Sequence, residues 1–233
     1  MPGPSDPPDP SARADPLAPS DPLARADPSA RGDEPARTDE AAAGPARDRS
    51  MAARLDGYRP EGAAEIADVA RLRQLLGRTD DPWPRTLPLH VTASALIVHP
   101  ASGRVLLRWH QRQQAWLHVG GHGDPGERDP LAIALREADE ETGLTDLVPW
   151  PDDQIRHIAI VPVPASRQEP AHEHADVRFV LATGHPDTAR PETPDTPLRW
   201  VSVADAASTP EANMRDAWLR VQSLLAAQAR SAR

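Results

Sequence analysis

Three glutamates lie close together near the middle of the chain, and their spacing suits metal chemistry. Glu137, Glu140 and Glu141 stand at positions i, i+3 and i+4, which places their carboxylates on one face of an α-helix. Like charges at this spacing destabilise a helix by roughly 0.2–0.5 kcal/mol per pair. A divalent cation would turn this repulsion into binding energy, because carboxylate oxygens are ligands that Mg²⁺ and Mn²⁺ prefer. Taken alone, the same pattern is also typical of a solvated acidic helix face.

The surrounding residues predict a glycine loop followed by one helix, which would position these carboxylates. Four glycines come first and allow the loop to approach a ligand closely: Gly120, Gly121, Gly123 and Gly126. Asp129 and Pro130 are typical of a helix start, and Gly143 is typical of a helix end. Between these signals, four residues form an apolar stripe at helical spacing: Leu131, Ala134, Leu135 and Ala138.

Residues 121–144 together resemble the Nudix box, G-x5-E-x7-R-E-U-x-E-E-x-G-U, in which U is an aliphatic residue. Eight positions match in order: Gly121, Glu127, Arg136, Glu137, Glu140, Glu141, Gly143 and Leu144. The chain departs from the pattern twice, because eight residues instead of seven separate Glu127 from Arg136, and because Ala138 is smaller than the usual aliphatic residue. The extra residue falls at the junction of loop and helix, so the spacing inside the helix is intact.

The resemblance extends beyond the box. Trp116 followed by Gly-Gly-His at 120–122, and the apolar segment 89–98, are similar to a bacterial Nudix subgroup. The resemblance therefore covers about residues 60–230. It implies an α/β (α+β) fold, a Nudix-like α/β/α sandwich with a mixed β-sheet, in which the box forms a loop–helix–loop motif.

This family implies a metal-dependent hydrolase that cleaves a diphosphate linkage in a nucleoside diphosphate derivative. Mg²⁺ is the implied cofactor, with Mn²⁺ as a substitute, and four residues are the implied ligands: Glu137, Glu140, Glu141 and, through its carbonyl, Gly121. Water attacks phosphorus in line, and Glu140 or Glu141 accepts its proton. We expect Arg136 to orient a glutamate, through a charge-assisted pair with Glu127 or Glu137, rather than to touch the substrate.

Aromatic residues just before and within the box are candidates for the substrate pocket. Trp116, His118 and His122 are predicted to contact substrate, and His110 lies close to them in the sequence. Trp116 equally suits a place in the hydrophobic core, because its large ring can stack on a base or fill a core.

A second group of polar residues lies downstream of the box. His172, His174 and Asp176 share one face if they form a strand, because side chains alternate along a strand. Such a group suits a metal or phosphate site, or an extra carboxylate for the box metals. The default interpretation is an exposed loop and strand start without a site.

Composition divides the chain into three parts. Residues 1–50 contain a hexapeptide repeat rich in Pro, Asp, Ala and Arg and are predicted to be disordered, because they cannot bury enough surface to offset their ordering entropy. Since Met51 follows the repeat directly, this extension need not belong to the working protein. Residues 51–85 predict an N-terminal helix and a linker, and residues 86–230 are the expected Nudix hydrolase domain.

The expected elements of these parts follow from periodicity and from glycine and proline breaks. A helix over 61–77 carries an apolar stripe: Ile66, Val69, Ala70, Leu72, Leu75 and Leu76. The segments 89–100 and 104–109 predict a hairpin, and further strands are expected near 155–163, 176–183 and 198–203. A last helix is expected from Pro210, with Thr209 as its N-cap. Trp200 and Trp218 are expected in the core.

Composition also narrows the partners and the compartment. The formal net charge of -9 disfavours a nucleic-acid-binding surface, so a nucleotide-type small molecule is the expected partner. The absence of cysteine excludes disulfides and a cysteine nucleophile, and it suits the reducing cytoplasm, where we expect the protein. No apolar run reaches the roughly 20 residues of a membrane span, and no secretory signal is visible.

Three other functions compete with the hydrolase. A non-catalytic Nudix-like domain that senses a nucleotide usually loses box glutamates, whereas all three remain here. An isomerase of the isopentenyl diphosphate type is associated with a catalytic cysteine, which this chain lacks. An interaction protein acting through its repeat segment would lack aromatic anchors for a tight interface.

The substrate stays open between ADP-ribose, a modified nucleoside triphosphate, a nucleotide sugar and a coenzyme. The single tyrosine, Tyr58, lies upstream of the box, so the downstream tyrosine associated with dinucleoside polyphosphate hydrolysis is missing. Nudix domains are often dimers, which makes a homodimer one of the expected states.

Overall fold

The structure is a computed structural model that describes residues 50–167 and 169–231. Apart from Ser50, the repeat segment that is predicted to be disordered lies outside these residues. Within the described ranges, no helix combines the length and the apolar character that crossing a membrane requires.

A mixed eight-stranded sheet carries the described fold. Its two long strands, β1 (Leu89–His99) and β7 (His172–Ala182), pair in parallel. Antiparallel partners extend the sheet: β2 (Arg104–His110) and β4 (Val119–His122) on β1, and β5 (Val148–Pro149) and β6 (His157–Val163) on β7. Two more strands pair with β2: β3 (Ala115–Leu117) and β8 (Leu198–Ser202). The hairpin predicted for residues 89–100 and 104–109 is confirmed, and it consists of β1 and β2.

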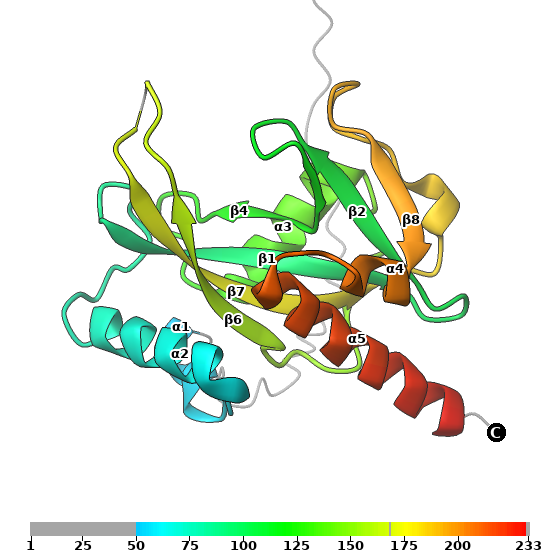
Figure 1. Cartoon of the computed structure of the whole chain (residues 1–233), viewed down its shortest axis with the longest axis horizontal. Helices are drawn as coiled ribbons and strands as arrows, with labels where there is room; N and C mark the ends of the chain where they lie inside the picture. The colour runs from blue at the N-terminus through cyan, green and yellow to red at the C-terminus, as the bar shows by residue number, and fades with distance from the viewer. Residues whose placement is uncertain (1–49, 168, 232–233) are drawn as a thin grey trace, which may run out of the picture. The chain divides into compact units, whose positions relative to one another are not determined.

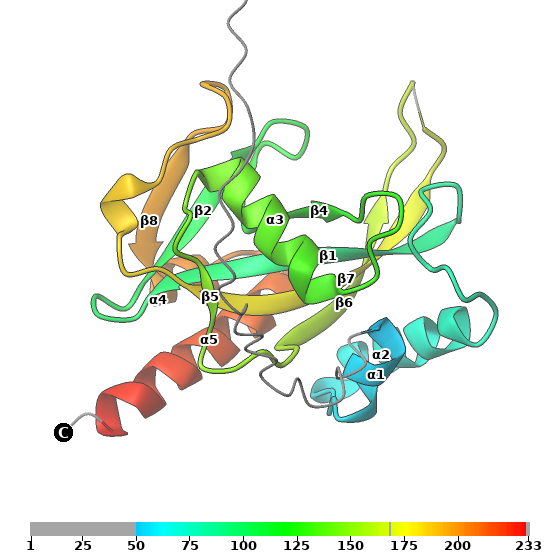
Figure 2. The same ribbon diagram turned by 180° about the vertical axis from the view of Figure 1, so that it is seen from behind.

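Helices cover both faces of this sheet (Figures 1 and 2). α3 (Pro130–Thr142) lies on one face, and α5 (Ala212–Ser231) lies on the other, next to the short α4 (Val203–Ala207). α1 (Met51–Asp56) and α2 (Gly62–Leu76) lie beside β6, and a 3₁₀ turn, η1 (Pro186–Thr188), lies between β7 and β8. The predicted α/β/α sandwich around a mixed sheet is confirmed.

Alternation along β1 gives the two faces of the sheet different surroundings. Val91, Ala93 and Ile97 pack in one core cluster with the apolar stripe of α3, whereas Leu96 and Val98 pack in a second cluster with α5. The first half of the α5-facing side is polar instead: His90, Thr92 and Ser94 are all buried there. The sequence pattern LHVTASALIV thus encodes one fully apolar face and one face that is polar at its beginning.

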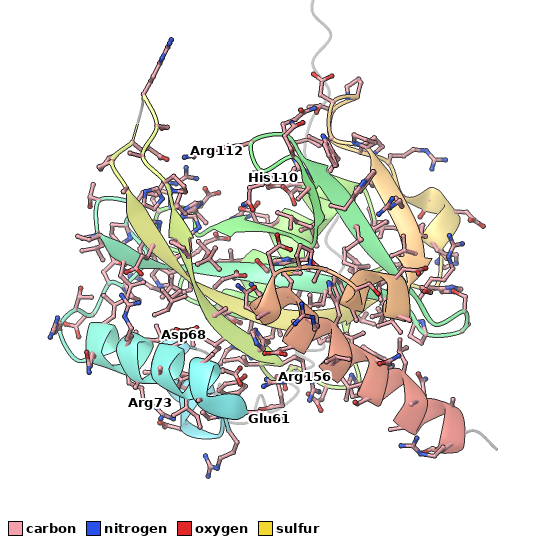
Figure 3. All side chains as sticks on the ribbon, in the orientation of Figure 1. Glu61, Asp68, Arg73, His110, Arg112 and Arg156 are labelled. Carbon is pink, nitrogen blue, oxygen red and sulfur yellow. The ribbon has the colours of Figure 1, made fainter. Side chains whose placement is uncertain are left out.

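Polar contacts hold α2 on β6. The Asp68 carboxylate accepts a hydrogen bond from the backbone N–H of Ile160 at 3.0 Å (Figure 3), and Glu65 accepts one from the backbone N–H of Ile158 at 2.9 Å. Val69 is buried as the predicted stripe requires, but Ile66 is 54% exposed. The stripe is narrower than predicted because α2 packs along an outer strand and buries one side only.

Three expectations at the C-terminal end need correction. β7 begins at His172, four residues earlier than predicted, because its first residues continue the parallel pairing with β1. The last helix begins at Ala212, two residues later than predicted, because the Thr209 hydroxyl donates to a carboxylate rather than capping the helix. Trp218 is buried as expected, whereas Trp200 is only half-buried.

Asp146 ties the segment after α3 to the end of β7. Its carboxylate accepts hydrogen bonds from the Thr183 hydroxyl at 2.6 Å, the Gly184 N–H at 2.8 Å and His185 Nδ1 at 2.9 Å. Burial raises the pKa of Asp146, but these hydrogen bonds outweigh it and lower the pKa to about 2. The carboxylate is therefore held in its ionised form.

Candidate active site

The box segment (residues 121–144) forms the loop and helix that its end signals predict. The Asp129 carboxylate accepts a hydrogen bond from the Leu131 N–H at 3.1 Å, and Pro130 occupies the first turn. Gly143 takes a left-handed φ of 63° and its N–H donates to the Asp139 carbonyl at 2.7 Å. Both predicted helix ends are confirmed, so the three glutamates stand on one regular helix.

Arg136 connects the loop of the box segment to its helix. Its guanidinium forms a bidentate pair with Glu127, with N–O distances of 3.1 and 2.9 Å. The same group contacts the carboxylates of Glu137 at 3.1 Å and Glu140 at 3.0 Å, and it donates to the His122 carbonyl at 2.9 Å. The predicted ion pairs of Arg136 with Glu127 and Glu137 are thus both present. The extra residue between Glu127 and Arg136 is absorbed in the loop before α3.

Glu137 and Glu141 form the inner pair of carboxylates. Their side chains are 16% and 13% exposed, and one helical turn separates them on the side of α3 that faces β4. A Cβ added at Gly121 would lie 2.5 Å from the Glu137 carboxylate, and the Gly120 N–H donates to Glu141 at 3.1 Å. The glycines therefore permit the carboxylates to touch the strand backbone. Glu140 lies further out, with its side chain 54% exposed.

Arg108 of β2 completes the group and was not among the residues predicted from the sequence. It lies 3.1 Å from the Glu141 carboxylate and 3.6 Å from Glu192, and its side chain is 15% exposed. The only sequence signal for it is a cationic residue inside the otherwise apolar strand RVLLRW. Because Arg108 and Glu141 belong to different elements 33 positions apart, the sequence does not show that Arg108 meets the box.

Burial leaves the inner carboxylates short of compensating charge. Desolvation raises the pKa of Glu141 to about 7, although Arg108 and the Gly120 N–H act in the opposite direction. Desolvation also raises the pKa of Glu137, against the opposing effect of Arg136. A cation at this place would therefore be bound favourably by both groups.

The predicted substrate-binding residues do not form one cluster. Trp116 lies edge-on to Trp109, with 5.5 Å between ring centroids, and the Arg199 guanidinium lies 4.3 Å from its ring centroid. His118 contacts the Asp176 carboxylate at 3.2 Å, and burial lowers the pKa of its imidazole. The His122 ring lies among other histidines, away from the box carboxylates, although its carbonyl accepts from Arg136. Contact with substrate stays a prediction for all three.

Asp176 is the centre of a buried network. Its carboxylate accepts hydrogen bonds from Ser94 at 2.6 Å, Thr92 at 3.2 Å and Arg178 Nε at 2.7 Å. Arg178 is itself buried and lowers the pKa of Asp176 below its ordinary range, outweighing the opposing effect of burial. Asp176 lies on the sheet face opposite α3, because its neighbours on β7 pack with α3. It is therefore not an additional carboxylate beside Glu137.

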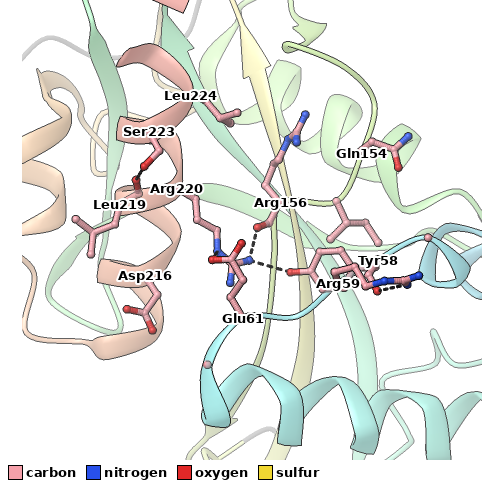
Figure 4. A pocket seen from close by; sticks show the side chains of 13 residues that line it. Tyr58, Arg59, Glu61, Gln154, Arg156, Asp216, Leu219, Arg220, Ser223 and Leu224 are labelled. Atoms are coloured by element: carbon pink, nitrogen blue, oxygen red, sulfur yellow. Dashed lines mark hydrogen bonds and ion pairs between the residues drawn. The ribbon is translucent and has the colours of Figure 1, made fainter. Parts of the chain in front are cut away.

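A pocket of about 730 Å³ lies apart from the box, between the α1–α2 junction and α5 (Figure 4). At its wall, Arg220 donates to the Tyr58 hydroxyl at 3.0 Å, to the Arg156 carbonyl at 2.6 Å and to the buried Glu65 carboxylate at 2.5 Å. No residue of the box segment lines this pocket. The contacts join the α1–α2 junction, α2 and the residue before β6 to α5, so this ion pair has a structural role.

Comparison with known proteins assigns the class that the fold and the box define. Residues 88–222, more than half of the chain, match the family model of the NUDIX domain. The chain belongs to the Nudix family. It is an enzyme, a hydrolase. No matching sequence was found among curated proteins.

Solved structures include several with a similar fold. A NUDIX family hydrolase from Clostridium perfringens is 23% identical and has a TM-score of 0.43, with 58% of this chain and 97% of that chain covered. An Ap4A hydrolase from C. elegans is 21% identical, with a TM-score of 0.48 and coverage of 59% and 98%. An E. coli dihydroneopterin triphosphate pyrophosphohydrolase is 19% identical, with a TM-score of 0.44 and coverage of 59% and 97%.

Proposed function

We propose that this enzyme hydrolyses the diphosphate linkage of a nucleoside diphosphate derivative at the inner face of α3. One observation carries the proposal: the half-buried carboxylates of Glu137 and Glu141 lie side by side against the glycine backbone of β4, with Arg136 and Arg108 holding them. A solvated acidic helix face would need neither the glycines nor the two arginines. The arrangement therefore supports a site for a cation and a phosphate substrate.

The residues present fit a hard divalent cation. All side-chain donors are carboxylate oxygens, which Mg²⁺ and Mn²⁺ prefer, and the raised pKa values of Glu137 and Glu141 indicate charge that the protein alone does not balance. Glu137, Glu140 and Glu141 would hold the ion, with the Gly121 carbonyl as a further ligand. When bound, such an ion supplies neutralisation of phosphate charge and a more acidic water.

The other residues of the box act by positioning and by proton transfer. Arg136 holds Glu137 and Glu140 in place through the contacts that it shares with Glu127. Attack of water on phosphorus releases one proton, and Glu140 or Glu141 accepts it at a carboxylate oxygen while the phosphate leaving group departs from phosphorus. Glu140 is the more exposed of the two, and Glu141 is the more buried. The pH–rate profiles of their glutamine variants would show which of them accepts the proton.

Turnover of a substrate panel by the full chain tests the proposal. Phosphate release from ADP-ribose, nucleotide sugars, modified nucleoside triphosphates and coenzymes would be followed with Mg²⁺ or Mn²⁺, with a phosphatase coupled where needed. We expect at least one compound to turn over and Glu141→Gln to lower its kcat by about 100-fold or more.

Asp139→Asn is the matched control, because Asp139 is an exposed acidic residue on the same helix outside the box pattern. It should leave kcat unchanged. If no compound is hydrolysed but a nucleotide binds, the proposed hydrolysis is wrong and the chain is better described as a nucleotide-sensing domain. Equal losses in Asp139→Asn and Glu141→Gln would show that only the net charge of the helix matters.

A further inference from the structure

Four imidazole rings meet on the sheet face opposite α3. His90 comes from β1, His122 from β4, and His172 and His174 from β7. His90 is the direct register partner of His174, and His122 is paired with the next same-face position of β1, Thr92. Ring centroids lie 4.7–5.3 Å apart for the five neighbouring pairs among them. We call these four residues the histidine cluster.

The ring nitrogens come close enough to share one ion. The Nε2 atoms of His90 and His122 are 3.1 Å apart, and so are the Nε2 atoms of His172 and His174. One nitrogen from each of His90, His172 and His174 lies within 4.8 Å of the others. Nitrogens bound at 2.0–2.1 Å to a tetrahedral zinc ion lie about 3.4 Å from one another, so the nitrogens of these three rings need to approach by at most about 1.4 Å.

Hydrogen bonds to the backbone select the tautomer that a metal needs. His90 Nδ1 lies 3.0 Å from the Leu87 carbonyl, and His172 Nδ1 lies 2.9 Å from the Pro170 carbonyl. A carbonyl only accepts, so the proton of each neutral ring sits on Nδ1 and the lone pair of Nε2 points into the cluster. Metal-bound histidines have this same arrangement, with the second ring nitrogen donating to a carbonyl or carboxylate.

The donor set differs from that of the box. Imidazole nitrogens suit zinc, cobalt, nickel and copper, whereas Mg²⁺ prefers oxygen. Among the hydrogen bonds of the described residues, none joins a carboxylate to the cluster: Glu173 pairs with Arg71, and Asp176 is held by Arg178. Only His90 is fully buried, so an ion can reach the cluster through the other, half-buried rings.

We propose that His90, His172 and His174, with His122 as the fourth ligand, bind one divalent transition metal ion of the zinc class. The site is separate from the carboxylates of the box and does not depend on the proposed function. It joins the beginnings of β1 and β7 to the end of β4, where the box segment starts. His122 directly follows Gly121, and its carbonyl accepts from Arg136, so the ion would fix the entry to the box as well as three strands.

Calorimetric titration of the chelator-treated full chain with ZnCl₂, at pH 7.5 with excess Mg²⁺, tests the proposal. We expect one Zn²⁺ per chain and a rise in Tm of about 5–10 °C at hundredfold excess over Kd. The visible absorption of Co²⁺ should show tetrahedral nitrogen coordination. The chain has no cysteine, so no thiolate competes for either ion.

Variants then locate the ion. His174→Ala should weaken Zn²⁺ binding by about 100-fold or more, since loss of a supporting group alone costs 10–100-fold in known sites. His185→Ala, which removes an exposed histidine outside the cluster, and Glu141→Gln should leave binding unchanged. If His174→Ala does not fold, His172→Gln at a half-buried position makes the same test. Absence of Zn²⁺ binding in the wild type, full binding by a folded cluster variant, or loss of binding in Glu141→Gln would each overturn the proposal.

Discussion

Gly121 and Gly120 are neighbours, yet an added methyl group should have different effects at the two positions. At Gly121 it should lower catalysis, and at Gly120 it should lower the stability of the fold. At Gly121 the new Cβ would lie 2.5 Å from the Glu137 carboxylate, where ordinary contact begins at 3.4 Å, so the carboxylate must move by about 0.9 Å. The φ of Gly121 is outside the left-handed region, so the backbone tolerates alanine. The atoms that must move end a flexible side chain, and the fold should therefore remain stable.

The same displacement should be costly for catalysis. A misplacement of about 1 Å in a catalytic group can lower the rate by about 100-fold. We therefore expect Gly121→Ala to lower kcat by roughly 100-fold and to weaken Mn²⁺ binding, while Tm changes by less than about 2 °C.

Gly120→Ala is the contrasting variant. Its φ is 147°, and its Cβ would lie 2.6 Å from the Ala93 carbonyl oxygen and from the Ser94 Cα, which are backbone atoms that cannot yield. The combined strain should cost about 2–5 kcal/mol and lower Tm by about 5–15 °C.

Thermal unfolding, Mn²⁺ titration and turnover of the substrate found in the panel would be measured on both variants and the wild type. The reasoning is refuted if Gly121→Ala keeps wild-type kcat and Mn²⁺ affinity, because the contact between Gly121 and Glu137 would then be irrelevant to the site. It is also refuted if Gly121→Ala lowers Tm by as much as Gly120→Ala does.

Three further predictions concern charged contacts. Arg136→Lys should lower kcat by roughly 100-fold although it keeps the positive charge, because lysine cannot form the bidentate pair with Glu127. Wild-type kinetics of this variant would contradict the prediction. Asp146 has a pKa of about 2 in the folded chain against an ordinary value of 3.8, so the stability that it contributes is fully present above about pH 4 and is lost as the pH falls towards 2. Urea unfolding should show a smaller loss over this range for Asp146→Asn than for the wild type, and equal losses would contradict the assignment. Arg220→Ala should destabilise the fold by about 3–5 kcal/mol, because it leaves the Glu65 carboxylate buried without its partner, and Glu65→Leu in addition should recover part of the loss in urea unfolding.

Local signals in the sequence were sufficient to predict the helix of the box. Asp129, Pro130 and Gly143 act on backbone groups within a few residues of themselves, so the helix that they delimit is independent of the rest of the fold. The ion pair of Arg136 with Glu127 was predictable for the same reason, since a short loop and two helical turns connect the two residues. Signals of this kind also predicted the β1–β2 hairpin.

The features that could not be predicted depend on contacts between residues that are far apart in the sequence. The start of β7 was missed because its first residues are held by β1, more than 80 positions away in the chain. The contact of Arg108 with Glu141 depends on the packing of β2 against the box, and no spacing in the sequence encodes it.

The two proposed metal sites show this division within one molecule. The carboxylate group was predictable without the fold, because one helix with a regular period carries all three glutamates. It placed His172 and His174 on a common face, but it did not show that His90 and His122 join them. The rings meet through the sheet, because the pairing of β1 with β4 and β7 sets which residues become neighbours across strands.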